Sequence, residues 1–461
     1  MTAPQPARSW LAEFAWSPSL GLCTDVLIEV TGDRLTAVIP DTRRPPATAT
    51  RLPGLTMPGL ANAHSHAFHR ALRGATQAGR GTFWSWRDRM YEVAGRLDPD
   101  SYLALATAVY AEMALAGISC VGEFHYLHHG PHGTPYANPN EMGQVLIEAA
   151  RRAGLRITLL DACYLSGGLA ADGRQEPLEG VQLRFGDTDG AAWAARAAAL
   201  GPDALGSLGP RARAGAAIHS VRAVPPGQMP EVVAWSHRYG APLHTHVSEQ
   251  VAENRACIAA HRRTPAEVLE SAGVLGPRST AVHATHLTDS DVGLLGDSRC
   301  YTCFCPTTEA ELADGIGPAR DLADAGSAIT LGTDSQAVID VLEEARRVEL
   351  DERLASQERG HFTAAELADA ATAAGHASLG WPEAGELAAG GLADFVTIAL
   401  DSVRTAGGTR GTVLESVIFC ASAADVRHLV VGGEDVVIDG RHTQLDDVPG
   451  ALAAAISAVL S

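Results

Sequence analysis

Eight short apolar runs follow one another through the middle of this 461-residue chain, with alanine-rich amphipathic stretches between or after them. The stretches SYLALATAVYAEMALAG and AELADAATAAG are typical of helices. Apolar strands that alternate with helices predict a parallel sheet covered on both faces. Eight such units favour a closed (β/α)8 barrel over an open sheet, and no GxGxxG follows the first run to indicate a dinucleotide-binding fold. The runs are LTMPGLANA (55–63), ISCVGEF (118–124), RITLLDA (156–162), AGAAI (214–218), APLHT (241–245), STAVH (279–283), CYTCF (300–304) and AITLG (328–332).

The two ends of the chain show a different pattern. CTDVLIEVTGDRLTAVIP near the N-terminus, and LADFVTIALDS and HLVVGGEDVVIDGRHT near the C-terminus, consist of short β-type runs separated by Gly-Asp and Asp-Gly turns. We therefore predict an α/β protein with a (β/α)8 TIM barrel over residues 56–386. A small β-sandwich domain is expected to form from the N- and C-terminal segments, residues 1–55 and 387–461.

The chain is acidic, with a formal net charge of −19 and a pI near 5.3. Such a charge disfavours nucleic acid and anionic membrane surfaces as partners, so we expect neither. If the ligand is a small anion, arginines close to it must offset the charge of the whole protein.

Lysine is absent from the sequence, so all 35 basic residues are arginine. This excludes a Schiff-base lysine, a phosphate-binding P-loop lysine and a carboxylated lysine that bridges two metal ions. A metal site in this chain must therefore be built from His, Asp, Glu or Cys.

The sequence also bears on where the protein works. We see no signal peptide at its start and no apolar run near the roughly 20 residues of a membrane span. The eight cysteines are scattered except for Cys300, Cys303 and Cys305, which lie in an apolar run without a second cysteine pair and are interpreted as core residues. We expect reduced thiols and a cytoplasmic location.

Polar clusters stand at the ends of four apolar runs, where a barrel opens into its loops: His64-Ser65-His66, His246 to Glu249, His283 and Asp334. Positions i and i+2 of a strand point to the same face, so both histidines of the first cluster can reach one ion. Three histidines and one aspartate are a complete ligand set for a catalytic divalent metal. A lone His-x-His is more often an ordinary pair of loop histidines, but the joint pattern indicates a metal site.

A divalent metal such as Zn²⁺ would lower the pKa of a bound water toward ~7 and so favour hydrolysis at this site. Hydrolysis also needs side chains that carry protons. Glu249 lies just beyond the run that carries His246, and its alternative interpretation is a surface-loop carboxylate. Asp334 suits both metal binding and acceptance of a proton from water. His283 suits a place beside the metal, where it would polarise the atom under attack or hold the hydroxide. We expect Glu249, His283 and Asp334 to be catalytic.

This constellation resembles the amidohydrolase superfamily over nearly the whole chain, including the β domain split between the two ends. In the branch without a bridging lysine, one metal ion is used and the fifth-strand motif is His-x-x-Glu, which matches His246 and Glu249. The resemblance implies one Zn²⁺ per subunit, a homodimer, and a catalytic role for His283 beside the ion. The metal ligands that it implies are His64, His66, His246 and Asp334.

Within the superfamily, several long stretches resemble the formimidoylglutamate deiminases of histidine breakdown. They are HSHAFHRALRG, FWSWRDRMY, EFHYLHHGPHGTPYANPNEM, HSVRAV, VHATHLT and CPTTEAELADGI. This resemblance implies zinc-dependent hydrolytic deimination of N-formimino-L-glutamate, a small dicarboxylate, to N-formyl-L-glutamate and ammonia. The residues that it implies for substrate binding are His69, Arg87, Tyr126, His219 and Arg222.

The residue types agree with that implication. Guanidinium groups bind carboxylates through paired hydrogen bonds, so two arginines suit two carboxylates. The alternative for Arg87 and Arg222 is a structural salt bridge, the common role of arginine. Two places depart from the family pattern, namely His69 where Gln is usual and Ser335-Gln336 where Ser-His is frequent. A histidine at position 69 can donate to a carboxylate, but its charge would then depend on pH.

Two other functions fit parts of the pattern. The nearer one is another mononuclear-zinc amidohydrolase, a guanine- or adenosine-type deaminase acting on a purine or cyclic amidine. Planar bases would not need two arginine clamps, so substitution of Arg87 or Arg222 separates the two functions. The more distant one is a catalytically silent relative that serves as a structural or interaction module. Such proteins typically lack metal ligands, whereas every ligand position is filled here.

Overall fold

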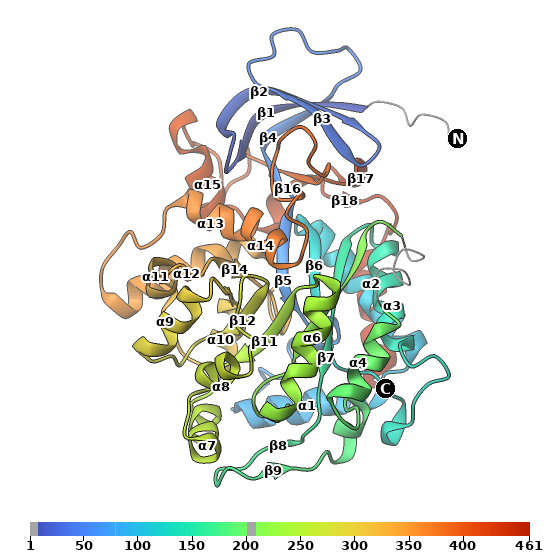
Figure 1. Cartoon of the computed structure of the whole chain (residues 1–461). Coiled ribbons are helices and arrows are strands. Elements are labelled where there is room, and N and C mark those ends of the chain that lie inside the picture. The colour runs from blue at the N-terminus through green and yellow to red at the C-terminus, as the bar shows by residue number, and fades with distance from the viewer. Residues whose placement is uncertain (1–7, 79, 201–208) are drawn as a thin grey trace.

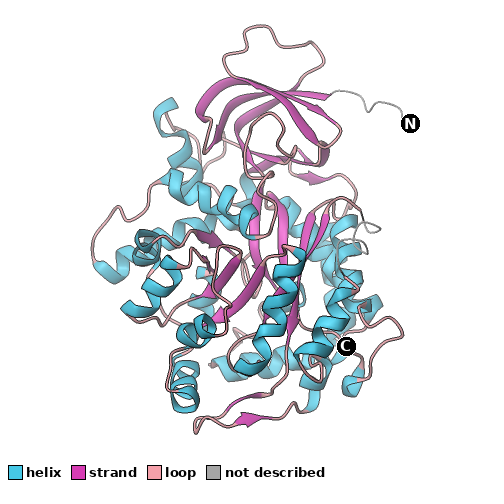
Figure 2. Ribbon diagram, in the orientation of Figure 1, coloured by secondary structure: helices cyan, strands magenta, loops and turns pink. Residues whose placement is uncertain are grey.

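The computed structural model describes residues 8–78, 80–200 and 209–461, and a barrel of eight parallel strands lies at its centre (Figures 1 and 2). The strands are β5 (Leu60–Ser65), β6 (Ile118–His125), β7 (Arg156–Cys163), β10 (Ala212–Ile218), β11 (Leu243–Val247), β12 (Ser279–His283), β13 (Tyr301–Phe304) and β14 (Ile329–Leu331). They are hydrogen-bonded in the order β14-β13-β12-β11-β10-β7-β6-β5. Each strand arises from one of the eight apolar runs, so the predicted α/β barrel is confirmed.

The barrel closes where β14 meets β5. The backbone N–H of Asp334 donates to the carbonyl of His64 over 3.0 Å, and the N–H of His66 donates to the carbonyl of Asp334 over 3.2 Å. The backbone groups that close the barrel thus belong to three of the four predicted metal ligands. The barrel therefore closes at the place where the metal site is predicted.

Helices surround the barrel on its outer face, and one of them, α1, lies at the carboxyl ends of the strands (Figures 1 and 2). They are α1 (Phe83–Arg96), α2 (Pro99–Leu115), α3 (Glu141–Arg152), α4 (Gly190–Ala198), α6 (Met229–Tyr239), α7 (Val251–His261), α8 (Pro265–Ser271), α9 (Asp289–Asp297), α10 (Pro306–Leu312), α11 (Ala319–Ala325), α12 (Val341–Ser356), α13 (Ala364–Ala371) and α14 (Ala373–Ser378), with short 3₁₀ turns η1 (Ala67–Leu72), η2 (Pro131–Gly133), η3 (Gly180–Arg184) and η4 (Pro226–Gln228). Local sequence explains their starts. Asp98 caps α2 by accepting from the N–H of Ser101, and Thr264 caps α8 in the same way.

The barrel strands are covered on both sides. Every residue of β6 and of β7 is buried, because side chains alternate between the barrel interior and the layer of helices. A strand buried on both faces has no polar face, which is why these segments form continuous apolar runs in the sequence.

The two ends of the chain form a second, separate sheet, at the top of Figure 1. Its strands are β1 (Arg8–Ser17), β2 (Gly21–Thr31), β3 (Arg34–Ile39), β4 (Thr50–Pro58), β15 (Phe395–Ile398), β16 (Val426–Val431), β17 (Glu434–Ile438) and β18 (Arg441–His442). The order is β18-β17-β16-β15-β4-β1-β2-β3, so the antiparallel pair of β4 and β15 joins the N-terminal half to the C-terminal half. Trp10 and Ile28 of one half share an apolar core with Phe395 and Val430 of the other, as expected for the predicted sandwich.

The two parts of the molecule are closely linked. Only Gly59 separates β4 from β5, and a Cβ atom there would lie 2.3 Å from the Ser119 hydroxyl oxygen, so no larger residue fits without movement. Arg156 of β7 forms a buried ion pair with Asp394, which precedes β15. The predicted domain boundaries remain predictions.

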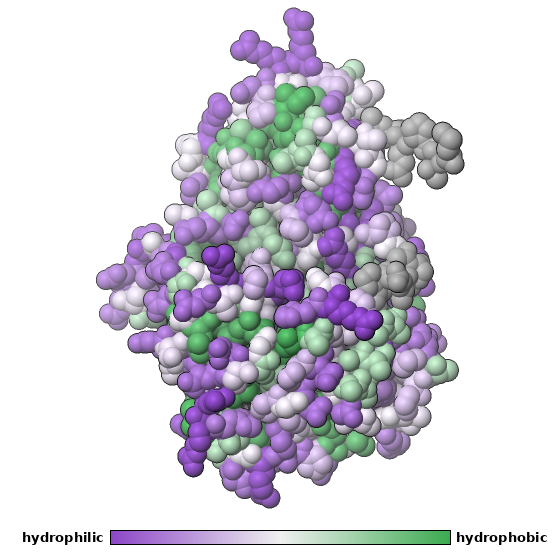
Figure 3. Space-filling model, in the orientation of Figure 1, coloured by the Kyte–Doolittle hydropathy of each residue, from purple (hydrophilic) through white to green (hydrophobic). Residues whose placement is uncertain are grey.

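The remaining C-terminal elements are η5 (Arg410–Thr412), α15 (Val413–Cys420), η6 (Ala423–Asp425) and α16 (Val448–Leu460), of which α16 lies against α2. All eight cysteines carry free thiols. Within the described ranges, no helix combines the length and apolarity needed to cross a membrane. On the face shown in Figure 3, apolar side chains gather in patches among a predominantly hydrophilic surface.

Candidate metal centre and active site

The predicted metal ligands meet at the carboxyl ends of the barrel strands. His64 lies near the end of β5, His66 directly follows that strand, His246 lies in β11 and Asp334 follows β14. All four are buried, with exposures between 0% and 6%. Strand ends therefore deliver the four side chains to one place, as the sequence predicts.

The donor atoms of these ligands converge. Nε2 of His64 lies 3.1 Å from Nε2 of His246, and Oδ1 of Asp334 lies 3.4 Å from Nε2 of both His64 and His66. Three imidazole nitrogens and one carboxylate oxygen are a ligand set of catalytic zinc and similar divalent ions. Neutral imidazoles that face each other through their lone pairs repel, so a cation between them stabilises the arrangement. The residues present thus fit one divalent metal ion.

The backbone fixes the rings of two ligands. Nδ1–H of His66 donates to the carbonyl of Phe124 over 2.9 Å, and Nδ1–H of His246 donates to the carbonyl of His219 over 2.8 Å. Each hydrogen bond leaves Nε2 free of hydrogen and directed at the metal position. Burial lowers the pKa of His64, His66 and His246, so the imidazoles are neutral and able to bind a metal.

Asp334 is held as a carboxylate. Burial by itself raises the pKa of a carboxyl group, but the interactions with His64, His283 and His66 outweigh burial and keep the pKa of Asp334 below its ordinary range. The backbone of Asp334 has φ of 39°, and Ser248 and His283 have φ of 51° and 68°. Residues other than glycine rarely adopt this left-handed region, and three such residues around one point are typical of a functional site.

A buried amide network joins the two loops that carry metal ligands. Gln336 donates from Nε2 to Oγ of Ser65 over 2.9 Å and to the carbonyl of Asp334 over 3.0 Å. It also accepts from Oγ1 of Thr333 over 2.7 Å. Ser65 lies between the two histidines of the β5 loop, so Gln336 ties that loop to the β14 loop. The departure from the frequent Ser-His pair therefore falls on a residue that holds the ligand loops together.

The predicted catalytic residues face one another. Nε2 of His283 lies 4.0 Å from Oε1 of Glu249 and 3.9 Å from Oδ2 of Asp334. Burial raises the pKa of Glu249, although the charges of His283 and Arg222 oppose this. Burial disfavours charge on His283, but Glu249, Glu309 and Asp334 outweigh it and raise the pKa of His283. Glu249 is 7% exposed, so it is not a surface-loop carboxylate, and its position suits proton transfer.

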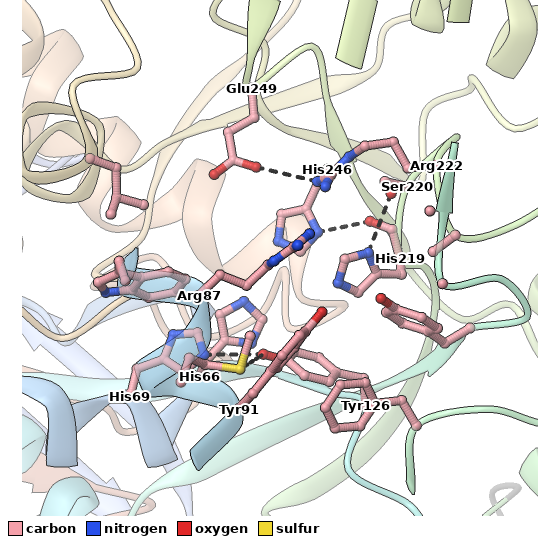
Figure 4. Close-up of a pocket in the computed structure, with 18 of the residues that line it drawn as sticks. His66, His69, Arg87, Tyr91, Tyr126, His219, Ser220, Arg222, His246 and Glu249 are labelled. Atoms are coloured by element: carbon pink, nitrogen blue, oxygen red, sulfur yellow. Dashed lines mark hydrogen bonds and ion pairs between the residues drawn. The ribbon is translucent and has the colours of Figure 1, made fainter. Parts of the chain in front are cut away.

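The metal ligands open onto a cavity of about 190 Å³ (Figure 4). This volume is below the roughly 300–1,000 Å³ of drug-sized pockets, so the cavity suits a small molecule. His64 is fully buried, and every other predicted site residue lines the cavity. These are His66, His69, Arg87, Tyr126, His219, Arg222, His246, Glu249, His283 and Asp334.

Both predicted arginines reach the cavity, Arg87 from α1 and Arg222 from the loop after β10 (Figure 4). The guanidinium carbon of Arg87 lies 5.5 Å from the ring centre of Tyr91. Nε of Arg222 donates to Glu253 over 2.8 Å, and its Nη2 lies 3.6 Å from Oε2 of Glu249. A structural salt bridge therefore anchors Arg222 at the same time as its guanidinium group faces the cavity.

The other predicted substrate contacts are neutral. Oη of Tyr126 and Nε2 of His69 lie 3.1 Å apart. Burial lowers the pKa of His69 to about 3, so the pH-dependent charge considered from the sequence does not arise near neutral pH. Burial, then the charge of Arg222, lowers the pKa of His219. Among the predicted substrate contacts, the two arginines consequently carry the positive charge.

Comparison with known proteins places the chain. The sequence profile of the amidohydrolase family matches residues 55–436. This chain belongs to the amidohydrolase family. A formimidoylglutamate deiminase of Pseudomonas aeruginosa is 35% identical to this amidohydrolase. The match covers 94% of the present chain and 95% of the Pseudomonas protein. An 8-oxoguanine deaminase of the same organism is 30% identical, over 85% and 84% of the two chains.

Solved structures share the architecture. An amidohydrolase from Brucella melitensis superimposes with a TM-score of 0.90 at 32% identity, covering 98% of this chain and all of that one. An adenosine deaminase from Xanthomonas campestris with bound zinc has the same fold, with a TM-score of 0.80 at 22% identity over 99% and 98% of the chains. The amidohydrolase is thus a hydrolase of carbon–nitrogen bonds, of the deaminating kind, with a cluster of side chains able to hold a metal. The roles of its individual residues remain predictions.

Several cavity residues of the amidohydrolase escape sequence prediction. Tyr91 and Tyr164 line the cavity, as does Glu176 from a small hairpin of β8 (Gly168–Leu169) and β9 (Gln175–Glu176). Tyr91 lies four residues after Arg87, one turn on along the same face of α1, and this spacing could have pointed to it. The hairpin strands are too short to leave a periodic signal.

Proposed function

We propose that this amidohydrolase catalyses zinc-dependent hydrolytic deimination of N-formimino-L-glutamate, which yields N-formyl-L-glutamate and ammonia. The observation that carries the proposal is the placement of Arg87 and Arg222 in one small cavity with the metal ligands. A protein with a net charge of −19 repels a dicarboxylate unless local cations offset that charge. The relative at 35% identity is named for this reaction.

The metal is proposed to be zinc, one ion per subunit, held by His64, His66, His246 and Asp334. Three neutral imidazoles and a carboxylate suit zinc, and the related adenosine deaminase contains it. When bound, such an ion acts as a Lewis acid and lowers the pKa of water toward ~7. The proposal includes a homodimer, as the family resemblance implies.

The chain's own residues supply the proton transfers. We assign Asp334 as the acceptor of the proton from the attacking water, because it is ionised and faces His283 across the site. The water oxygen bonds to the formimino carbon, and His283 stabilises the tetrahedral centre by hydrogen bonding. Attack turns the C=N bond of the protonated formimino group into a single bond, and Glu249, with its raised pKa, delivers a proton to the resulting amino nitrogen. The C–N bond then breaks and ammonia leaves as the hydroxyl becomes the formyl C=O. The hydroxyl proton returns to Glu249, and Asp334 releases its proton to solvent.

The carboxylates of the substrate are proposed to bind the guanidinium groups, with neutral donors completing each site. Tyr126, His69 and His219 lie around the cavity beside Arg87 and Arg222 (Figure 4). Charge-assisted paired hydrogen bonds to arginine favour a planar carboxylate over a neutral group. This places selectivity for a dicarboxylate on the two cations.

A purine deaminase is the second candidate, favoured by the 30% identity to an 8-oxoguanine deaminase. To separate the two, kcat/KM is measured for N-formimino-L-glutamate, 8-oxoguanine and adenosine with one zinc-loaded preparation. The proposal predicts that N-formimino-L-glutamate is preferred by at least about 10³-fold, since a missing ionic partner in a polar site is strongly rejected. Preference for a purine would overturn it.

The arginines provide a sharper prediction. Arg87→Met is expected to raise KM for N-formimino-L-glutamate by about 30- to 1,000-fold, with a smaller effect on kcat, because loss of one buried charge partner costs roughly 2–4 kcal/mol. Steady-state kinetics of ammonia release measure this. Arg89→Met is the matched control, because Arg89 lies on the same helix, is 62% exposed and pairs with Glu92. Equal KM values for the Arg87 variant and the wild type would remove Arg87 from the binding site.

A further inference from the structure

Glu309 contacts Nδ1 of His283, the ring nitrogen opposite the one that faces Glu249 and Asp334. It lies in the first turn of α10, which follows β13, next to the strand β12 that carries His283. Oε1 of Glu309 lies 3.2 Å from Nδ1 of His283 and accepts from the backbone N–H of Cys305 over 2.8 Å. Both side chains are buried, with exposures of 6% and 1%. Glu309 is not among the residues that line the cavity beside the metal ligands.

This contact determines which ring nitrogen of His283 faces the reaction. A carboxylate only accepts hydrogen bonds, so Nδ1 of His283 must be the donor. Nε2 is then directed at Glu249 and Asp334, at 4.0 and 3.9 Å. The ring of His283 is also stacked on the ring of His246, with ring centres 5.6 Å apart and planes at 13°. Stacking fixes the plane of the imidazole, and the hydrogen bond to Glu309 fixes which of its two nitrogens points toward the cavity.

Glu309 itself is held by its neighbours. Glu344 of α12 accepts from the N–H of Thr307 over 2.9 Å, at the start of the same turn. Oγ1 of Thr308 lies 3.0 Å from Oγ of Ser335 and accepts from the N–H of Ser335 over 3.1 Å. Ser335 follows Asp334, so the turn that carries Glu309 is fixed to the loop that carries the proposed base.

We infer that Glu309 is a positioning residue that acts through His283, holding its imidazole so that Nε2 faces the reacting centre. The inference rests on the catalytic role of His283 in the proposed function. A carboxylate behind a functional histidine fixes its tautomer and orientation, and loss of such a partner commonly reduces activity 10- to 100-fold. The competing role is structural, since Glu309 also caps the N–H of Cys305.

A double-mutant cycle separates the two roles. Glu309→Gln is expected to lower kcat for N-formimino-L-glutamate by about 10- to 100-fold with KM changed less than about threefold. In a His283→Asn background the same substitution is expected to change kcat less than about twofold, because its effect passes through the imidazole. Glu344→Gln is the matched control: it perturbs the same turn of α10 without contacting His283. Equal losses from Glu309→Gln in both backgrounds, or a loss no greater than that of the control, would overturn the inference.

A second measurement needs no substrate. ¹⁵N shifts of the His283 ring, assigned by the His283→Asn variant, are expected to show hydrogen on Nδ1 in the metal-loaded protein and a shifted population in Glu309→Gln. Hydrogen on Nε2 alone in the wild-type protein would overturn the inference even if Glu309→Gln fails to fold. If the protein proves inactive on N-formimino-L-glutamate but the ¹⁵N result holds, the proposed substrate fails and the positioning role of Glu309 stands.

Discussion

Asp334→Asn is expected to lower kcat for N-formimino-L-glutamate by about 10³- to 10⁴-fold. The substitution keeps the shape of the side chain but removes the negative charge that faces His64, His66 and His283. Asparagine is a poor base, and general base catalysis contributes typically 10²- to 10⁴-fold, while the weakened ligand set adds to the loss. Such a change corresponds to about 4–5 kcal/mol of transition-state stabilisation.

Initial rates of ammonia release, with the metal content of each preparation measured alongside, test this prediction. Asp324→Asn serves as the control, since Asp324 is a surface residue paired with Arg320 and remote from the metal ligands. A variant that kept more than about a tenth of wild-type kcat would refute the assignment of Asp334 as the base.

Glu249→Gln is expected to lower kcat by about 10²- to 10⁴-fold and to leave metal content unchanged. Glutamine fills the same space beside His283 and Arg222 but cannot carry a proton to the leaving nitrogen. Because Glu249 is not a proposed metal ligand, this variant separates loss of proton transfer from loss of the ion. KM is expected to change little.

Parallel kinetics and metal analysis of Glu249→Gln and Glu92→Gln make the measurement, with the exposed Glu92 on α1 as the control. Loss of metal in the Glu249 variant, or retention of most of its activity, would contradict the role of proton carrier assigned to this residue.

The metal centre is the part of the molecule that the sequence predicts best. His64, His66, His246 and Asp334 each stand at the end of an apolar run, and parallel strands in a barrel bring their carboxyl ends to one face. The apolar character of each run and the polar residue at its end are local properties of the sequence. Once the strands are parallel, these local patterns are enough to predict that the side chains converge.

Contacts between distant loops are less predictable. Glu309 stands 26 residues from His283 in the sequence, and Gln336 stands 271 residues from Ser65. Neither residue has a chemical signature of its own, because buried amides and carboxylates serve many structural roles. Their importance becomes visible only when packing shows which donors they accept from and which loops they join.

The charge of His69 is a second property that the sequence alone does not predict. The residue type alone allows titration near neutral pH, whereas burial in the fold lowers the pKa of this side chain to about 3. The degree of burial depends on how the η1 turn packs beneath the cavity, which the sequence around position 69 does not specify.

Ammonia release from N-formimino-L-glutamate by the purified zinc-loaded protein, with and without a chelator, tests the central claim most directly. The proposed function predicts robust release that stops when the chelator removes the metal and returns when zinc is restored. Release that persists in metal-free protein would contradict the metal-dependent mechanism, and no release from protein with confirmed bound zinc would contradict the substrate.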